Sequence, residues 1–317
     1  MKKYIFTLVL TIITIVSFSQ KKITKKCISE EKSISVNTCD LKGTLLIPKK
    51  KFEKGNLVIL IAGSGPTDRN GNNIVMKNNS LKMLAEGLCL NGIASFRYDK
   101  RMIGESTDTI LTEDKLRFET YINDAVEIVN YFKKDTRFNK IIIAGHSEGS
   151  LIGMIVAQKT HLDKYISLAG VAISADEILK EQLKKQKSIK DESYAIIDSL
   201  KLGIKVDSIS KNLQVIFRKS VQDYMISWFK YNPQTEISKL DIPIFIIQGN
   251  NDIQVDTTNA ELLHKANPKS ELQIISGMNH ILKPASDNYV ENLKTYYYPD
   301  LELHPDLLNI IINFIKK

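Results

Sequence analysis

The chain has 317 residues, of which 43% are hydrophobic and 25% are charged, so it has the composition of a globular protein with a large core. The formal net charge is +8, but the lysines are scattered and no basic stripe with interleaved aromatic residues is present. Nucleic-acid binding is therefore poorly supported, and we interpret the lysines as solvated surface.

The first 20 residues have the pattern of a signal peptide. Lys2 and Lys3 precede an apolar run of about 14 residues at 5–18, and small residues follow at the positions that a signal peptidase reads. The run is shorter than the ~20 residues that span a bilayer. We therefore expect cleavage near Ser19 or Gln20, no stable membrane span afterwards, and a periplasmic or secreted domain at 21–317.

Three cysteines remain in the expected domain. Cys27 and Cys39 lie twelve residues apart, and an exported protein could join them. Cys89 falls in an apolar helical pattern and is interpreted as a small buried residue. No Cys/His spacing resembles a zinc site, so we expect no metal.

The first half of the chain predicts strands alternating with helices. Segments 32–36 and 41–47 read as a short antiparallel pair before the main sheet, around a turn at 37–40. A glycine-rich loop begins at Gly63, directly after a buried strand. The alternation of strands and helices favours a mostly parallel sheet with helices on both faces. Further strands are predicted at 56–62, 93–98 and 165–168, and helices at 80–90 and 118–132.

The segment 140–153 carries a G-x-S-x-G motif around Ser147. The apolar run 141–144 predicts a strand buried on both faces, and apolar residues after the motif recur at helical spacing. A serine between a strand and a helix is forced into a strained turn that exposes its hydroxyl at the carboxyl edge of the sheet. The motif alone is common by chance, but this context indicates a nucleophile.

The alternation stops between residues 175 and 239. This stretch of about 60 residues reads as helical at 177–186, 194–202 and 209–229. Its last helix carries apolar and aromatic residues that could pack on the sheet, form a lid over a pocket, or do both. After the insert, strands are predicted at 241–248 and 272–275, and helices at 259–266 and 306–315.

A serine nucleophile needs a base within reach and an acid that orients the base, in the chain order Ser, Asp or Glu, His for this kind of turn. Among the five histidines, His280 alone lies in a loop just after a late strand. Asp252 follows the strand at 241–248. Its rival, Asp256, could instead be a helix N-cap.

The oxyanion of an acyl-transfer reaction needs backbone N–H donors. Glu148, directly after the serine, supplies one, and the loop after the strand 56–62 should supply the other, from Ser64. The same loop is a poor phosphate-binding loop, because no G-K-[ST] follows it.

Three sequence blocks, at 63–72, 98–106 and 145–149, together carry a family resemblance. The chain resembles the α/β-hydrolase superfamily, specifically exported bacterial serine esterases, over roughly residues 43–316. The resemblance implies an α/β-hydrolase fold, in which we interpret the stretch 175–239 as a helical lid insert. It also implies hydrolysis of small-molecule carboxylic esters through an acyl-enzyme without a cofactor. Ala62 stands where many relatives have histidine, and Met102 where glycine is common.

The leading hypothesis is a carboxylesterase with Ser147, Asp252 and His280 as its triad. The same groups could serve a peptidase of the prolyl-aminopeptidase type or a thioesterase, which the sequence does not separate. A non-catalytic hydrolase-fold binding protein is less favoured, because all three triad members are present.

Overall fold

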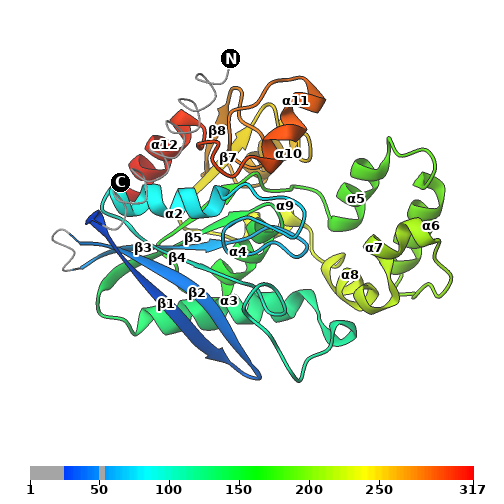
Figure 1. Cartoon of the computed structure of the whole chain (residues 1–317), viewed down its shortest axis with the longest axis horizontal. Helices are drawn as coiled ribbons and strands as arrows, with labels where there is room; N and C mark the ends of the chain where they lie inside the picture. The colour runs from blue at the N-terminus through cyan, green and yellow to red at the C-terminus, as the bar shows by residue number, and fades with distance from the viewer. Residues whose placement is uncertain (1–24, 50–53) are drawn as a thin grey trace, which may run out of the picture.

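The computed structural model describes residues 25–49 and 54–317, and an eight-stranded sheet forms its centre (Figure 1). The strand order is β1-β2-β4-β3-β5-β6-β7-β8. From β4 to β8 in this spatial order, which includes β3, neighbouring strands pair in parallel. β2 pairs antiparallel with both β1 and β4. The strands are β1 (Cys27–Val36), β2 (Cys39–Pro48), β3 (Gly55–Ile61), β4 (Ala94–Tyr98), β5 (Phe138–His146), β6 (Lys164–Leu168), β7 (Ile244–Gly249) and β8 (Glu271–Ile275).

The first hairpin differs from its prediction in one respect. The two strands pair antiparallel as expected, but they are longer, and the turn is confined to Asn37 and Thr38. They also continue the main sheet through β4 instead of standing before it, because residues 43–46 pair with residues 95–98.

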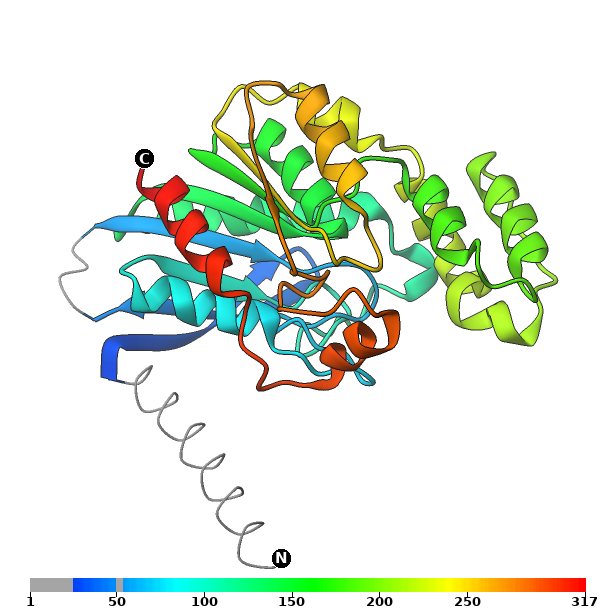
Figure 2. The same cartoon turned by 90° about the horizontal axis from the view of Figure 1, so that it is seen from above.

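Helices cover both faces of the sheet (Figure 2). α2 and α12 pack on one face with Val58 and Leu60 of β3, while α3, α4 and α10 share the other core with Ile59. Both faces are therefore apolar, which explains the continuous hydrophobic runs of the parallel strands. The helices on these faces are α2 (Ser80–Leu90), α3 (Phe118–Lys133), α4 (Glu148–Lys159), α10 (Thr257–Ala266) and α12 (Pro305–Lys316).

Between β6 and β7 the structure has helices and no strand, in the region predicted as the insert (Figure 1). The single helix predicted over 209–229 is wrong, because Arg218 has an extended backbone and interrupts it. The Arg218 guanidinium pairs with Glu113, outside the insert. The helices here are α5 (Ala175–Leu183), α6 (Lys190–Lys201), η2 (Lys211–Leu213), α7 (Gln214–Phe217), η3 (Lys219–Val221), α8 (Gln222–Trp228) and α9 (Pro233–Ser238).

Several short helices were not predicted. They are α9 in the insert, together with η1 (Glu113–Lys115), α11 (Tyr289–Lys294) and η4 (Thr295–Tyr297) elsewhere.

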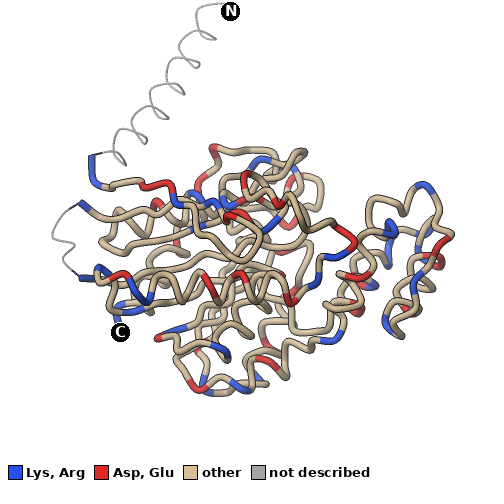
Figure 3. The backbone as a smooth tube through the Cα atoms, turned by 90° about the horizontal axis from the view of Figure 1, so that it is seen from below, with Lys and Arg blue, Asp and Glu red and all other residues tan. Residues whose placement is uncertain are grey.

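Lysine and arginine are interspersed with aspartate and glutamate along the described chain, as Figure 3 shows. No helix among residues 25–49 and 54–317 is long and apolar enough to cross a membrane. The predicted signal peptide at 1–20 lies outside the described residues.

The structure corrects the interpretation of the cysteines. Cys27 is joined to Cys89 of α2, and Cys39 is free and buried. Within the β1–β2 hairpin, Cys27 lies opposite Pro48, whereas Cys39 lies opposite Val36 at the other end. Strands of this length separate Cys27 from Cys39 by on the order of 30 Å, too far for a disulfide bond.

Reduction of the Cys27–Cys89 bond is expected to lower the free energy of unfolding by about 4 kcal/mol. The two residues are 62 positions apart, so the bond restricts a long loop of the unfolded chain. Urea denaturation with and without reductant measures the loss, and the Cys39→Ala variant should show the same loss. Three free thiols in the denatured, unreduced protein would contradict the pairing.

Candidate active site

Ser147 stands between the last residue of β5 and the first residue of α4, with φ 54° and ψ −119°. A residue other than glycine rarely adopts a positive φ, so the surrounding packing must hold this strained turn. A Cβ atom on Gly145 would lie 2.2 Å from the Gly149 carbonyl oxygen, and one on Gly149 would lie 2.3 Å from that of Ile61. Both glycines of the motif are thus required by close contact, as the motif predicts.

Asp252 and His280 form a buried pair, with 2.7 Å between Oδ2 of the aspartate and Nδ1 of the histidine. Their side chains are 0% and 5% exposed. Gln248 donates to the same Asp252 oxygen, and the amides of Gln254 and Val255 donate to the other. Burial alone would raise the pKa of Asp252, but the charge of His280, its hydrogen bond and the two amide hydrogen bonds lower the pKa below its usual value.

An ionised Asp252 favours the histidine tautomer with its hydrogen on Nδ1, which leaves the lone pair of Nε2 available as a base. Asp256, the rival acid, is the N-cap residue of α10, where its carboxylate accepts from the Asn259 side chain. The structure therefore pairs the predicted base with Asp252 and not with Asp256.

His146 ties the His280 loop to the serine turn. Its Nε2 atom donates to the His280 carbonyl oxygen at 2.7 Å, and the two rings lie 4.8 Å apart between centroids. In the described part of the chain no hydrogen bond joins the Ser147 hydroxyl to His280. Catalytic hydrogen bonds are often long without a ligand, so the lack of this bond does not argue against Ser147 and His280 as nucleophile and base.

The loop after β3 lies directly against the serine, because a Cβ atom on Gly63 would be 3.2 Å from the Ser147 Cβ atom. The next residue is Ser64, the predicted amide donor. Among the described residues, neither the Ser64 N–H nor the Glu148 N–H donates a hydrogen bond to a protein acceptor. Both are therefore available to a ligand.

The first two sequence blocks meet at Asp99, which follows β4. One of its carboxylate oxygens accepts from the Arg69 amide at 2.7 Å and the other from the Glu105 amide at 3.0 Å. Met102, in the same loop, has φ 66°. Glycine would adopt this conformation without the cost that a Cβ atom brings.

Sequence reasoning missed three residues of this site: Lys100, His146 and Gln248. Lys100 is buried and bonds both Gly63 and Glu148. A charged residue two positions after a buried strand was the available signal for it, but its partners lie in the loop after β3 and in the first turn of α4. His146 lies inside the serine motif, but its hydrogen bond to the His280 backbone depends on tertiary structure.

Comparison with known families places the chain. Residues 44–266, more than half of the chain, match the family model described as BD-FAE. The chain belongs to the BD-FAE family. The matched region contains Ser64, Ser147 and Asp252 and ends before His280.

This BD-FAE family member is 28% identical over 267 residues to esterase EstD from Thermotoga maritima. The match covers 80% of the chain and 60% of EstD, so the chain spans about 60% of that curated relative's length. Est1E from Butyrivibrio proteoclasticus, solved with ferulic acid, has a TM-score of 0.61 at 20% identity and covers 90% of this chain and 100% of its own. The Pyrococcus furiosus esterase Pf2001 has a TM-score of 0.62 at 15% identity, covering 93% and 92%. These likenesses confirm the predicted α/β-hydrolase fold.

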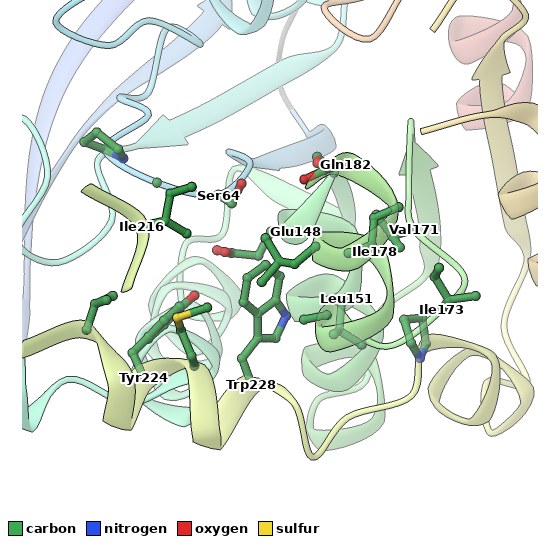
Figure 4. A pocket seen from close by; sticks show the side chains of 18 of the residues that line it. Ser64, Glu148, Leu151, Val171, Ile173, Ile178, Gln182, Ile216, Tyr224 and Trp228 are labelled. Carbon is green, nitrogen blue, oxygen red and sulfur yellow. The ribbon is translucent and has the colours of Figure 1, made fainter. Parts of the chain in front are cut away.

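A cavity of about 390 Å³ lies between the serine turn of this family member and helices of the insert (Figure 4). Ser64, Ser147 and Glu148 lie on its wall. Much of the remaining wall is apolar, including Leu151, Val171, Ile173, Ile178, Met225 and Trp228. Such a cavity suits an uncharged organic group next to the serine.

Helix α8 both packs on the sheet domain and lines this cavity. These are the two roles that the sequence suggested for the apolar face of the last helix of the insert. Trp228 stacks on Phe118 of α3 with 5.9 Å between ring centroids, and Tyr224 meets Tyr121 edge-on at 5.6 Å. Tyr224 and Trp228 also line the cavity.

No group of three or more His, Cys, Asp or Glu side chains suited to a metal ion is found within the described ranges.

His146 is expected to make the protein less stable in acid. Burial, reinforced by the charge of His280, lowers the pKa of His146 from 6.5 to about 4. Between these values the unfolded chain binds a proton that the folded chain does not, so stability falls as the pH falls. The full loss is about 3 kcal/mol. Urea denaturation from pH 7.5 to pH 4 should show a shallower decline for His146→Gln. The exposed His161→Gln variant should keep the wild-type decline, and equal slopes in all three proteins would contradict the assignment.

Proposed function

We propose that the protein is a carboxylesterase that hydrolyses small-molecule carboxylic esters through an acyl-enzyme on Ser147. The observation that carries the proposal is the buried Asp252–His280 pair. The His280 carbonyl oxygen accepts a hydrogen bond from His146, the residue directly before the strained, glycine-flanked Ser147. The esterase relatives support the same reaction class.

In the first half-reaction, the Ser147 Oγ atom attacks the ester carbonyl carbon while Nε2 of His280 accepts the hydroxyl proton. The carbonyl oxygen becomes an oxyanion, which accepts hydrogen bonds from the N–H groups of Ser64 and Glu148. When the carbon–oxygen bond to the alcohol breaks, His280 returns the proton to the leaving oxygen. Asp252 keeps the imidazole oriented and stabilises its charged form.

In the second half-reaction, a water molecule attacks the acyl carbon and His280 accepts its proton. The bond to Ser147 then breaks, the serine regains a proton, and the carboxylic acid leaves. Every group needed is a protein side chain or amide, so this reaction requires no cofactor. The apolar cavity beneath the insert, which we propose acts as a lid, receives the acyl or alcohol portion.

The cavity wall argues against the aminopeptidase alternative. An enzyme that trims free amino ends needs an acidic group to bind the substrate ammonium. Among the residues lining the cavity, Glu148 alone is acidic, and Lys100 already neutralises it. A thioesterase would use the same groups, so we include thioesters in the test.

Export is part of the proposal. The Cys27–Cys89 disulfide bond supports an oxidising compartment such as the periplasm or the extracellular space. Amino-terminal sequencing of protein recovered from cell fractions should give a start after Ser19 or Gln20. Intact protein in the cytoplasmic fraction would contradict export.

The test of function is a substrate panel on the purified protein. We expect hydrolysis of p-nitrophenyl esters, with lower or no activity on matched thioesters and amino-acid amides. A fluorophosphonate probe should label the protein once, on the peptide that contains Ser147. Labelling elsewhere would contradict the assignment of the nucleophile. Failure both to label and to hydrolyse any ester would favour the non-catalytic binding protein.

A further inference from the structure

Lys100 is a buried cation that the proposed reaction does not use. Its side chain is 1% exposed and lies just beyond the carboxyl end of β4. Its Nζ atom donates to the Gly63 carbonyl oxygen at 2.6 Å and to Oε1 of Glu148 at 2.9 Å. The same atom lies 4.8 Å from the ring centroid of Tyr121. One ammonium group thus joins the loop after β3 to the first turn of α4.

The bond to Gly63 fixes the direction of a proposed oxyanion donor. The Gly63 carbonyl and the Ser64 N–H belong to one peptide group, and no cis peptide bond occurs in the described residues. In a planar trans peptide the two bonds point in opposite directions. When Lys100 holds the carbonyl on its own side, the Ser64 N–H must point away from it.

The bond to Glu148 acts on the second proposed donor. The Glu148 side chain is 2% exposed, and its carboxylate belongs to the residue whose backbone N–H faces the oxyanion. A buried carboxylate without a partner would oppose negative charge forming nearby. Lys100 neutralises that carboxylate and anchors the side chain of the residue that supplies the amide.

We propose that Lys100 is a positioning residue of the oxyanion hole, holding the Gly63–Ser64 peptide and Glu148 so that both amides meet the transition state. The inference rests on the proposed esterase function. Lys100 touches neither the substrate nor the reacting atoms, and it acts through the two amides. It therefore supports kcat more than ground-state binding, because the oxyanion exists only after attack.

The chain offers a matched control in Lys164. This buried lysine also donates to a backbone carbonyl, that of Phe314, at 2.6 Å, and also lies over an aromatic ring, at 4.9 Å. It is the first residue of β6, at the amino end of the strand, whereas Ser147 follows the carboxyl end of β5. Lys164→Met removes a carbonyl bond and a ring contact of the same kinds from the opposite edge of the sheet, but no ion pair among the described residues.

The experiment compares kcat, KM and thermal stability of the Lys100→Met and Lys164→Met variants on one ester. We expect Lys100→Met to lower kcat by about 10²–10³-fold with a KM within about threefold of wild type. Lys164→Met should keep kcat within about threefold. The affinity of Lys100→Met for a boronic acid, which forms a tetrahedral adduct on the serine, should fall with kcat/KM. A kcat for Lys100→Met within about threefold of wild type would overturn the proposal.

Two further variants separate positioning from simple neutralisation. Glu148→Gln keeps the lysine bond to Gly63 and should lose less than about tenfold in kcat. The double variant Lys100→Met/Glu148→Gln removes both buried charges together. Loss of a whole buried pair destabilises a fold less than loss of one partner, so the double variant still tests the role of Lys100 if Lys100→Met fails to fold. The double variant should remain at least about tenfold below Glu148→Gln. Equal rates would mean that Lys100 only neutralises the carboxylate, which overturns positioning.

The two proposals fail differently. A wild-type protein that neither hydrolyses esters nor reacts with the fluorophosphonate contradicts the esterase function itself. An active wild type whose Lys100→Met variant is equally active contradicts only the role of Lys100.

Discussion

Ser147→Ala is expected to lower kcat for ester hydrolysis by about 10⁵–10⁶-fold. Alanine cannot form the acyl-enzyme, and the Asp252–His280 pair has no hydroxyl to deprotonate. The fold should survive, because alanine meets the same positive φ that the serine already adopts. Ser147→Gly should be inactive as well but more stable than Ser147→Ala, since glycine relieves the backbone strain of the turn.

Ser64→Ala is the matched control for that experiment. Both serines lie on the cavity wall, but Ser64 is proposed to act through its backbone N–H, which alanine keeps. We expect kcat within about threefold of wild type, measured on the same ester. If Ser147→Ala kept more than about 1% of the wild-type kcat, another nucleophile would have to be sought. If Ser64→Ala were as inactive as Ser147→Ala, the hydroxyl of Ser64 would need a role of its own.

Much of the sheet could be predicted from the sequence, because parallel strands that are covered on both faces consist of short runs of apolar residues. β3, β5 and β7 are such runs, and each ends in a polar or glycine-rich loop that carries a candidate residue. Ser147 could be found from its motif, and Asp252 and His280 from the order in which loops follow strands. These signals are local in the chain or depend on topology alone.

The remaining features depend on which distant segments meet. The disulfide partner of Cys27 could not be chosen from spacing, because the hairpin register puts Cys39 at the far end of the hairpin and the packing of α2 brings Cys89 to Cys27. The helix predicted over 209–229 is interrupted at Arg218, whose charge pairs with Glu113 about one hundred residues earlier. Lys100 likewise lies in one of the three sequence blocks, but its bonds to Gly63 and Glu148 form only when the loops after β3 and β4 meet the first turn of α4.

Asp252→Asn is expected to lower kcat by about 10⁴-fold near neutral pH. The asparagine oxygen can still accept the amides of Gln254 and Val255, so the loop should keep its shape. Its NH₂ group would face Nδ1 of His280, where it favours the tautomer with the hydrogen on Nε2, the wrong nitrogen for a base. It also lacks the negative charge that stabilises the imidazolium in the transition state.

Asp256→Asn isolates this effect, because Asp256 lies four residues away and was the alternative acid. Asparagine is as good an N-cap residue as aspartate, so α10 should keep its start and kcat should stay within about twofold. Both variants are compared by kcat and by the rate of fluorophosphonate labelling at one pH, with thermal unfolding as the folding control. Labelling should slow in Asp252→Asn alone, because an unactivated serine reacts slowly with the probe. A large loss in Asp256→Asn with an active Asp252→Asn would transfer the role of the acid to Asp256, and the hydrogen bond between Asp252 and His280 would then be structural.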